Sequence, residues 1–205
     1  MTSMTSTQYT GTGASLVVSN FYLGWIGCTD HLLSLCVHDI IGKLESVKDI
    51  LSTIRNIVLF TRQSRLANEA LHKFQHSLGL VERQLIFDVI TRWNSTFYMI
   101  QRFVEEKVCV TACLNEKVFQ KHFMNMNTFK SIEWNSLEEL ISVLEPFEAA
   151  TRKLAVDSSP TLSIVIPLLT TLITSTETRS TDSVFLKDIK DNLRHYLEER
   201  FSDIY

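Results

Sequence analysis

Glycine and proline are scarce in this sequence: six glycines and three prolines are spread over 205 residues. Strand-rich folds use these residues in their many tight turns, so their scarcity argues against an all-β protein. Leu, Ile, Val, Glu and Lys instead recur at helical spacing over long stretches, which predicts a mainly α-helical protein with few strands.

The sequence also has no basic block and no long apolar run. Lys and Arg number 20 against 23 Asp and Glu, for a net charge of −3, so this segment is a poor candidate for a surface that binds DNA phosphates. No apolar run reaches the roughly 18 residues that cross a bilayer, and the first residues do not form a secretory signal. We expect no membrane partner and no small-molecule substrate.

Only four cysteines are present, in two close pairs: Cys28 with Cys36, and Cys109 with Cys113. In each pair the spacing points both side chains along one helix, which is not the pattern of a disulfide framework. Reduced thiols in the cytosol or nucleus are therefore expected. Cys109 and Cys113 have apolar neighbours, which favours a core position over a nucleophilic role.

The motif CTDH places Cys28 and His31 one helical turn apart, as in half of a metal site. Cys36 and His38 would complete four ligands, but on one helix His38 lies on a different face. The preferred interpretation is a buried cysteine and a histidine at the start of a helix. We expect no metal or cofactor in this segment.

The first half of the chain contains two predicted helices. Apolar residues recur every three or four positions between Thr29 and about Phe60, which predicts one long amphipathic helix that Gly42 bends. Ser64 is expected to cap a second helix that runs to about Ser77 and ends at Gly79.

Strand signals are few. Leu85 to Ile90 is the best candidate, with a buried helical turn as the alternative, and Leu16 to Val18 is weaker. Because a lone strand leaves its main-chain groups unpaired, residues 16–92 are predicted to be part of an α/β unit whose other strands lie elsewhere. Residues 1–15, rich in Ser, Thr and Gly, are predicted to be disordered.

Residues 93–205 are predicted to form a helical bundle, since short connections join successive helices. The helices are expected at about 95–114, 116–126, 136–155, 161–176 and 182–203. Asp157 to Pro160 is a predicted break, and Thr176 to Ser183 a polar loop. The last helix reaches the end of the sequence without a cap, so we expect the chain to be incomplete there.

The stretch DVITRWNST, which begins at Asp88, changes from strand-like to helix-like character. Asn94 or Ser95 is expected to cap the following helix, and Trp93 to wedge between that helix and the strand-bearing unit. Arg92 is suited to bind a phosphate, but a pair with a carboxylate such as Asp88 is the preferred interpretation.

The carboxylates do not form an obvious catalytic set. Two-metal phosphoryl transfer needs acidic side chains that converge from separate strands, and only Asp88 lies on a predicted strand. Asp30 and Asp39 fall on the first helix, where we expect them to be solvated. The sequence contains no glycine-rich phosphate loop and no nucleophile elbow.

Several motifs occur in a fixed order: CTDHLLSL, DVITRWNST, and WNSLEELISVLEPFEAATRKLAVDSSPTLSIVIPLL. Together they resemble the hAT superfamily of DNA transposases, in particular the host-adopted relatives that carry a BED-type zinc finger. The resemblance covers about residues 10–205. It implies a mainly α fold: a partial ribonuclease-H-like α/β unit, followed from near Asn94 by an all-helical insertion bundle.

The resemblance also bears on activity, because active members hold two divalent ions with three acidic residues. The position that matches the second acidic residue is Gly11, and the other two would lie outside this chain. The implied protein is a catalytically inactive, nuclear, DNA-associated relative with a role in transcription regulation. Zinc, DNA contacts and a homodimer would belong to the parent protein, with zinc only in a BED finger.

Two alternatives remain: a helical protein-interaction module without nucleic-acid contact, and, less favoured, an active metal-dependent transposase. The positions that match family motifs are expected to shape the ribonuclease-H-like rim and the insertion junction rather than to catalyse. They are Cys28, His31, Asp88, Arg92, Trp93 and Asn94.

Overall fold

The structure is a computed structural model that describes residues 17–18, 21–22, 29–124, 132–156 and 162–202. Its elements, in chain order, are β1 (Val17–Val18), β2 (Phe21–Tyr22), α1 (Thr29–Lys43), α2 (Glu45–Gln63), α3 (Arg65–Ser77), α4 (Trp93–Glu105), α5 (Lys107–Leu114), α6 (Lys117–Phe123), α7 (Trp134–Val156), α8 (Leu162–Ser175) and α9 (Val184–Arg200). The prediction of a mainly helical protein is confirmed.

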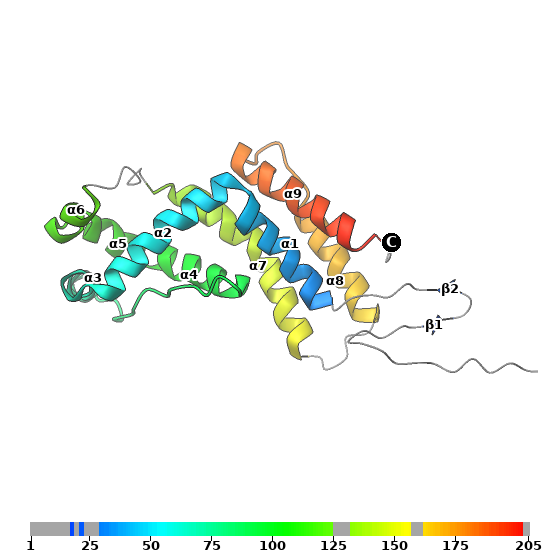
Figure 1. Cartoon of the computed structure of the whole chain (residues 1–205), viewed down its shortest axis with the longest axis horizontal. Coiled ribbons are helices and arrows are strands. Elements are labelled where there is room, and N and C mark those ends of the chain that lie inside the picture. The colour runs from blue at the N-terminus through cyan, green and yellow to red at the C-terminus, as the bar shows by residue number, and fades with distance from the viewer. Residues whose placement is uncertain (1–16, 19–20, 23–28, 125–131, 157–161, 203–205) are drawn as a thin grey trace, which may run out of the picture.

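The helices form an elongated bundle (Figure 1). The long helix α7 packs against α1, α4, α8 and α9, while α3 packs against α2 and α5 at the opposite end. Helices α1 and α2 follow one another along the length of the molecule and join its two ends.

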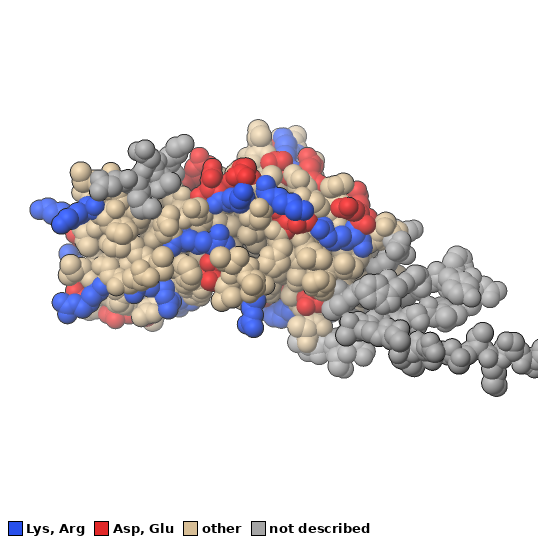
Figure 2. Space-filling model, in the orientation of Figure 1, with Lys and Arg blue, Asp and Glu red and all other residues tan. Residues whose placement is uncertain are grey.

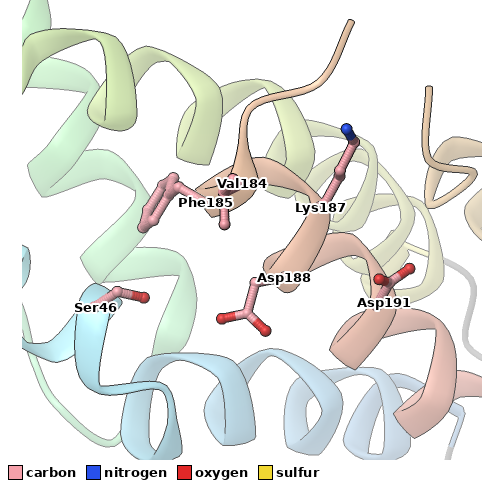
Figure 3. A pocket seen from close by; sticks show the side chains of 6 residues that line it. All are labelled: Ser46, Val184, Phe185, Lys187, Asp188 and Asp191. Carbon is pink, nitrogen blue, oxygen red and sulfur yellow. The ribbon is translucent and has the colours of Figure 1, made fainter. Parts of the chain in front are cut away.

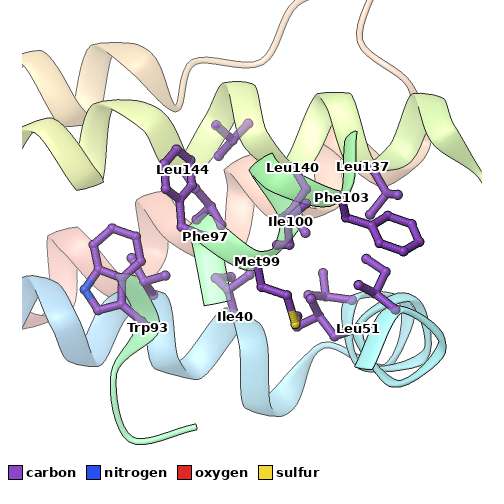
Figure 4. Packing of buried hydrophobic residues seen from close by; sticks show 14 of the residues in the cluster. Ile40, Leu51, Trp93, Phe97, Met99, Ile100, Phe103, Leu137, Leu140 and Leu144 are labelled. Atoms are coloured by element: carbon purple, nitrogen blue, oxygen red, sulfur yellow. The ribbon is translucent and has the colours of Figure 1, made fainter. Parts of the chain in front are cut away.

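A single hydrophobic cluster runs through the bundle, and Figure 4 shows part of it. Ile40 of α1, Ile100 of α4 and Leu144 of α7 are each at most 1% exposed and belong to it, so helices from both halves of the sequence share one core. Burying such side chains stabilises a fold by about 1.5–3 kcal/mol each, and this is the main force that holds the helices together.

The predicted helix from Thr29 to Phe60 is two helices. Leu44 adopts an extended conformation with φ −80° and ψ 110°, which ends α1 and begins α2. Gly42 lies within α1, so the interruption falls two residues later than the glycine suggested.

The prediction for α3 is confirmed at both ends. The Ser64 hydroxyl oxygen accepts a hydrogen bond from the N–H of Ala67 at 3.3 Å, as a helix cap does. At the other end Gly79 has a φ of +66°, and Leu80 N–H donates to the carbonyl of Gln75 at 2.9 Å.

The predicted strand from Leu85 to Ile90 is wrong: among the described residues these form no strand and pair with none, and Ile90 lies in a turn that the Arg92 N–H closes by donating to the Val89 carbonyl at 2.8 Å. Side chains of neighbouring helices bind their main chain instead. The described strands are β1 and β2, which pair antiparallel with Val17 opposite Tyr22, and β1 overlaps the weaker prediction. The described residues within 16–92 therefore show no partial α/β unit, and residues 1–15 lie outside the described residues.

In the second half, the predicted helix 95–114 divides at Glu106 into α4 and α5. The polar loop from Thr176 to Ser183 is confirmed, and the Ser183 hydroxyl caps α9 by accepting from Leu186 N–H at 3.0 Å. Helix α9 ends at Arg200, so the expectation of a helix that continues to the last residue is wrong. The predicted break at Asp157 to Pro160 lies outside the described residues. None of the described helices is both long and apolar enough to cross a membrane.

The two described glycines give a matched test of the backbone. A Cβ at either position would meet no atom within 4 Å, so only backbone conformation distinguishes them. We expect Gly79→Ala to destabilise the protein by about 1 kcal/mol, because an alanine is strained at positive φ. Gly42→Ala, within a helix, should stabilise it by about 0.5–1 kcal/mol. Urea unfolding measures both, and equal effects would contradict the assigned end of α3.

Candidate functional site

The DVITRWNST motif, residues 88–96, covers the end of the connection between α3 and α4 (residues 78–92) and the first turn of α4. This connection contains no helix or strand, and side chains from α2, α3 and α4 bind its main chain. The junction of the connection with α4 is the candidate functional site because four of the six motif positions lie there, namely Asp88, Arg92, Trp93 and Asn94. In addition, six exposed large hydrophobic residues occur within residues 78–90.

The main chain at the start of the connection is held by a buried glutamine. Gln75, which is fully buried, donates from Nε2 to the Arg83 carbonyl at 2.8 Å and accepts from Arg83 N–H at 3.3 Å. Two residues later, Arg62 Nη1 donates to the Leu85 carbonyl at 3.0 Å. These bonds replace those that a neighbouring strand would make.

Gln75 also reaches a buried carboxylate on the other side. Its Nε2 donates to Glu106 Oε2 at 2.9 Å, and Glu106 is only 5% exposed. Burial raises the pKa of the neighbouring Cys109 thiol, and the charge and hydrogen bond of Glu106 raise it further. Burial likewise raises the pKa of Cys113 to about 12. Both cysteines are neutral core residues at physiological pH, which agrees with the sequence-based interpretation.

Asp88 forms the tightest contact of the connection. Arg55 of α2 donates to it from Nε at 3.1 and 3.0 Å and from Nη2 at 2.6 Å, so the guanidinium engages both carboxylate oxygens. Thr96 of α4 donates its hydroxyl to Asp88 Oδ2 at 2.8 Å. Burial alone would raise the pKa of Asp88, but the hydrogen bonds from Arg55 and Thr96 outweigh it, and the pKa lies below its usual value.

This geometry corrects the expected pair between Arg92 and Asp88. Arg92 is exposed and forms no ion pair within the described residues, while Arg55 occupies the carboxylate. The expected caps are also wrong: Arg92 is the N-cap of α4 and forms no side-chain cap bond. The Ser95 hydroxyl instead accepts from Val89 N–H at 2.7 Å, and Asn94 is partly buried in the first turn.

Trp93, the first residue of α4, is 2% exposed. Figure 4 shows its ring against α1, on the side of Ile40 away from Leu51. It therefore packs among helices rather than against a sheet. Its Nε1–H is buried and has no hydrogen-bond partner within the described part of the chain.

The CTDH motif contributes no described metal site. Cys28 lies outside the described residues, His31 is exposed on α1, and Cys36 is buried. Across all residues that the structure describes, no three His, Cys, Asp or Glu side chains are grouped so as to hold a metal ion.

Asp30 and Asp39 are not the solvated residues that we expected. Asp30 Oδ1 is buried without a partner among the described residues, and burial raises the pKa of this carboxyl. Asp39 forms ion pairs with Lys43, at 2.9 Å, and with Arg200 of α9. The pair with Arg200 ties α1 to α9.

Figure 3 shows a hollow of about 520 Å³ between the start of α2 and α9. Ser46 of α2 lines the hollow on one side, and the other lining residues come from α9. They are Val184, Phe185, Lys187, Asp188 and Asp191. With one hydroxyl, one ammonium and two separate carboxylates, the hollow has no activated nucleophile and no anion cradle. It does not compete with the connection as a candidate site.

Comparison with known proteins identifies the family of this chain. The family model described as the ZBED1 RNase-like helical domain matches residues 26–143, more than half of the chain. The chain belongs to this family. The matched range contains the whole α3–α4 connection and Trp93.

Longer relatives agree with this assignment to the ZBED1 RNase-like helical domain family. The chain is 28% identical over 177 residues to human zinc finger BED domain-containing protein 4, which is 86% of this chain and 14% of that protein. It is 27% identical over 150 residues to human zinc finger BED domain-containing protein 6, again 14% of that protein. The chain therefore spans a small fraction of the relatives that it matches.

A transposase is also similar. Transposable element Hobo transposase of Drosophila melanogaster is 26% identical over 173 residues, which is 82% of this chain and 24% of that protein. The resemblance to hAT transposases and to their relatives with BED fingers is confirmed.

The residues that hold the connection were missed by the sequence analysis. Arg55 lies 33 residues before Asp88, and Gln75 lies 31 residues before Glu106, so no local motif joins them. The sequence signal for them is that Arg55 and Gln75 lie on the apolar sides of predicted helices. A buried polar group there would be costly without a hydrogen-bond partner, so such a partner is expected.

The Asp88 contact predicts a stability change that depends on pH. We expect Asp88→Asn to destabilise the protein by about 2 kcal/mol at pH 7, because Arg55 loses a buried charged partner. The expected loss is moderate because the Arg55 side chain is 25% exposed, so water solvates part of its charge. Since the pKa of Asp88 is lowered in the folded protein, its contribution is present above the unfolded-state pKa of about 3.9. That contribution should be lost as the pH falls below about 4.

Urea unfolding of both proteins at pH 7 and at pH 3 measures this difference. Asp49→Asn, at an exposed residue of α2 without an ion pair in the described chain, is the matched control and should change stability by less than about 0.5 kcal/mol. A difference between wild type and Asp88→Asn that stays constant down to pH 3 would rule out the ionised pair.

Trp93 permits a second test. Trp93→Phe removes an N–H that has no partner and retains most of the apolar ring, so it should cost less than about 1.5 kcal/mol. Trp93→Ala leaves a cavity and should cost about 3–5 kcal/mol. If the two variants were equally unstable in urea, the indole N–H would have to form a stabilising hydrogen bond.

Proposed function

We propose that this chain is a non-cleaving structural domain of a nuclear, DNA-associated protein derived from a hAT transposase, with a role in transcription regulation. Its relatives by sequence are BED-finger proteins and a transposase, which supports this origin. The domain would position other parts of the parent protein rather than carry out chemistry.

The observation that carries the proposal is the state of Asp88. From the sequence, Asp88 is the carboxylate best placed for a catalytic role, because it lies on the predicted strand. In the structure Arg55 donates to both of its oxygens. A divalent ion would have to displace the guanidinium and the Thr96 hydroxyl. The glycine at position 11, where the family resemblance expects an acidic residue, supports the same proposal.

DNA contact is assigned to parts of the parent protein outside this chain. On the face in Figure 2, Lys and Arg are interspersed with Asp and Glu and form no continuous basic surface. The net charge of −3 is consistent with weak attraction to phosphates. Zinc would be required only in a BED finger, where four ligands bind it in a closed site.

The second candidate function is a helical protein-interaction module without nucleic-acid contact, and helix α8 favours it. None of its 14 residues is charged. The hydroxyls of the exposed residues Thr170 and Thr171 donate to carbonyls of the same helix at 2.9 and 2.8 Å, so these donors are already satisfied within the helix. Such a surface suits an apolar partner helix.

Two measurements test the proposal. The purified 205-residue chain is expected not to nick supercoiled plasmid DNA with Mg²⁺ or Mn²⁺. Nicking that required the metal and disappeared in Asp88→Asn would overturn the structural role. The full-length protein should bind duplex DNA with an affinity that falls steeply with salt, whereas a protein-interaction module should not.

A further inference from the structure

A groove of about 510 Å³ lies between helices α7 and α8, and we call it the α7–α8 groove. Ala150 and Leu172, which are buried, lie deepest in it. Pro146 and Ala149 of α7 and Pro167 of α8 line it closer to the surface. Alanine and proline side chains are short, so the two helices do not fill the space between them. The volume of the groove is within the range of ordinary ligand sites.

The lining of the groove is mainly apolar. None of the 14 residues of α8 is charged. The hydroxyl of Thr171, which also lines the groove, donates to the Pro167 carbonyl at 2.8 Å, so this donor is satisfied within α8. An apolar groove accepts the apolar face of another helix, whose side chains recur at positions i, i+3, i+4 and i+7.

One end of the groove is positively charged. Among the described residues that line it, Lys153 is the one with a charge, and this exposed side chain forms no ion pair within the described part of the chain. Helices α7 and α8 pack antiparallel, so Lys153, near the end of α7, lies beside the start of α8 (Figure 1). The N-terminus of a helix carries a partial positive charge, which adds to that of the ammonium group. A carboxylate is therefore attracted to this end of the groove rather than to the other.

A second copy of this chain does not supply both features that the groove requires. Helix α8 is apolar on its exposed side but has no acidic residue to pair with Lys153. The described helices that contain acidic residues bury their apolar faces in the core of their own copy. The groove therefore suits a helix of a different protein.

We propose that the α7–α8 groove binds an amphipathic helix of another protein, with the apolar face in the groove and an acidic side chain on Lys153. The inference rests on the proposed role in transcription regulation, because segments that combine acidic and apolar residues are typical of activation domains. Such a segment becomes ordered only when it binds, so we expect an affinity of about 1–100 μM.

A synthetic peptide of about 15 residues serves as the probe, since shorter helices are unstable in water. It carries leucine at positions i, i+3, i+4 and i+7 and a glutamate at each end of this apolar face, so that one glutamate reaches Lys153 in either direction. Fluorescence anisotropy should show binding to the 205-residue chain. The matched peptide with glutamine in place of glutamate should bind about three- to fivefold more weakly. Equal affinities, or no binding at millimolar concentration, would overturn the proposal.

Substitutions in the chain locate the binding site. Ala149→Glu places a charge in the groove and should weaken binding of the glutamate peptide at least about tenfold. Ala155→Glu, at an exposed residue of α7 that does not line the groove, should leave the affinity unchanged. Lys153→Glu should weaken binding about tenfold and should instead favour a peptide with lysine in place of glutamate, whereas Lys121→Glu on α6 should do neither. Unchanged urea midpoints would show that the variants fold. Equal losses in Ala149→Glu and Ala155→Glu would contradict the proposed site.

Sedimentation equilibrium of the chain alone distinguishes a second copy from a different protein. Self-association that Ala149→Glu abolishes would assign the groove to a second copy and overturn the proposal. The DNA-nicking measurement is independent of the groove. A chain that neither nicks DNA nor binds the glutamate peptide would retain the proposed structural role and lose only this partner.

Discussion

The salt bridge between Arg55 and Asp88 is the contact on which the arrangement of the α3–α4 connection depends. Arg55 belongs to α2 and Thr96 to α4, and both bind the one carboxylate that the connection places between them. Arg55 and Asp88 are 33 residues apart, so bringing them together costs chain entropy. The packing of α2 and α4 around the buried carboxylate offsets this cost. The start of α4, including Trp93, is positioned as a consequence.

Side chains of neighbouring helices also bind the main chain of the connection, which forms no sheet. A polypeptide in a β conformation must satisfy its main-chain groups, and helices cannot supply a ladder of carbonyls and N–H groups. Here Gln75, Arg62 and Ser95 supply individual donors and acceptors to the main chain of the connection.

Local features of the fold were predictable from the sequence, and features that depend on distant residues were not. Ser64 and Gly79 mark the ends of α3 because a cap bond and a positive φ involve only neighbouring residues. Leu85 to Ile90 was predicted as a paired strand because its β-branched side chains favour the extended conformation, yet pairing depends on strands elsewhere. The break at Glu106 was missed because it coincides with a buried contact to Gln75, 31 residues away.

Prediction of the candidate site was likewise limited by contacts between residues that are distant in the sequence. The motif around Trp93 identified the correct segment, since a change from extended to helical character is visible in sequence. The partner of Asp88 could not be read from it, because Arg92 is four residues away and Arg55 thirty-three, and proximity in sequence favoured the wrong arginine. A motif carboxylate whose partner lies on a distant helix is indistinguishable in sequence from one left open for a metal ion. The distinction between a structural and a catalytic aspartate therefore rests on tertiary contacts, which is why the family resemblance alone does not determine what this domain does.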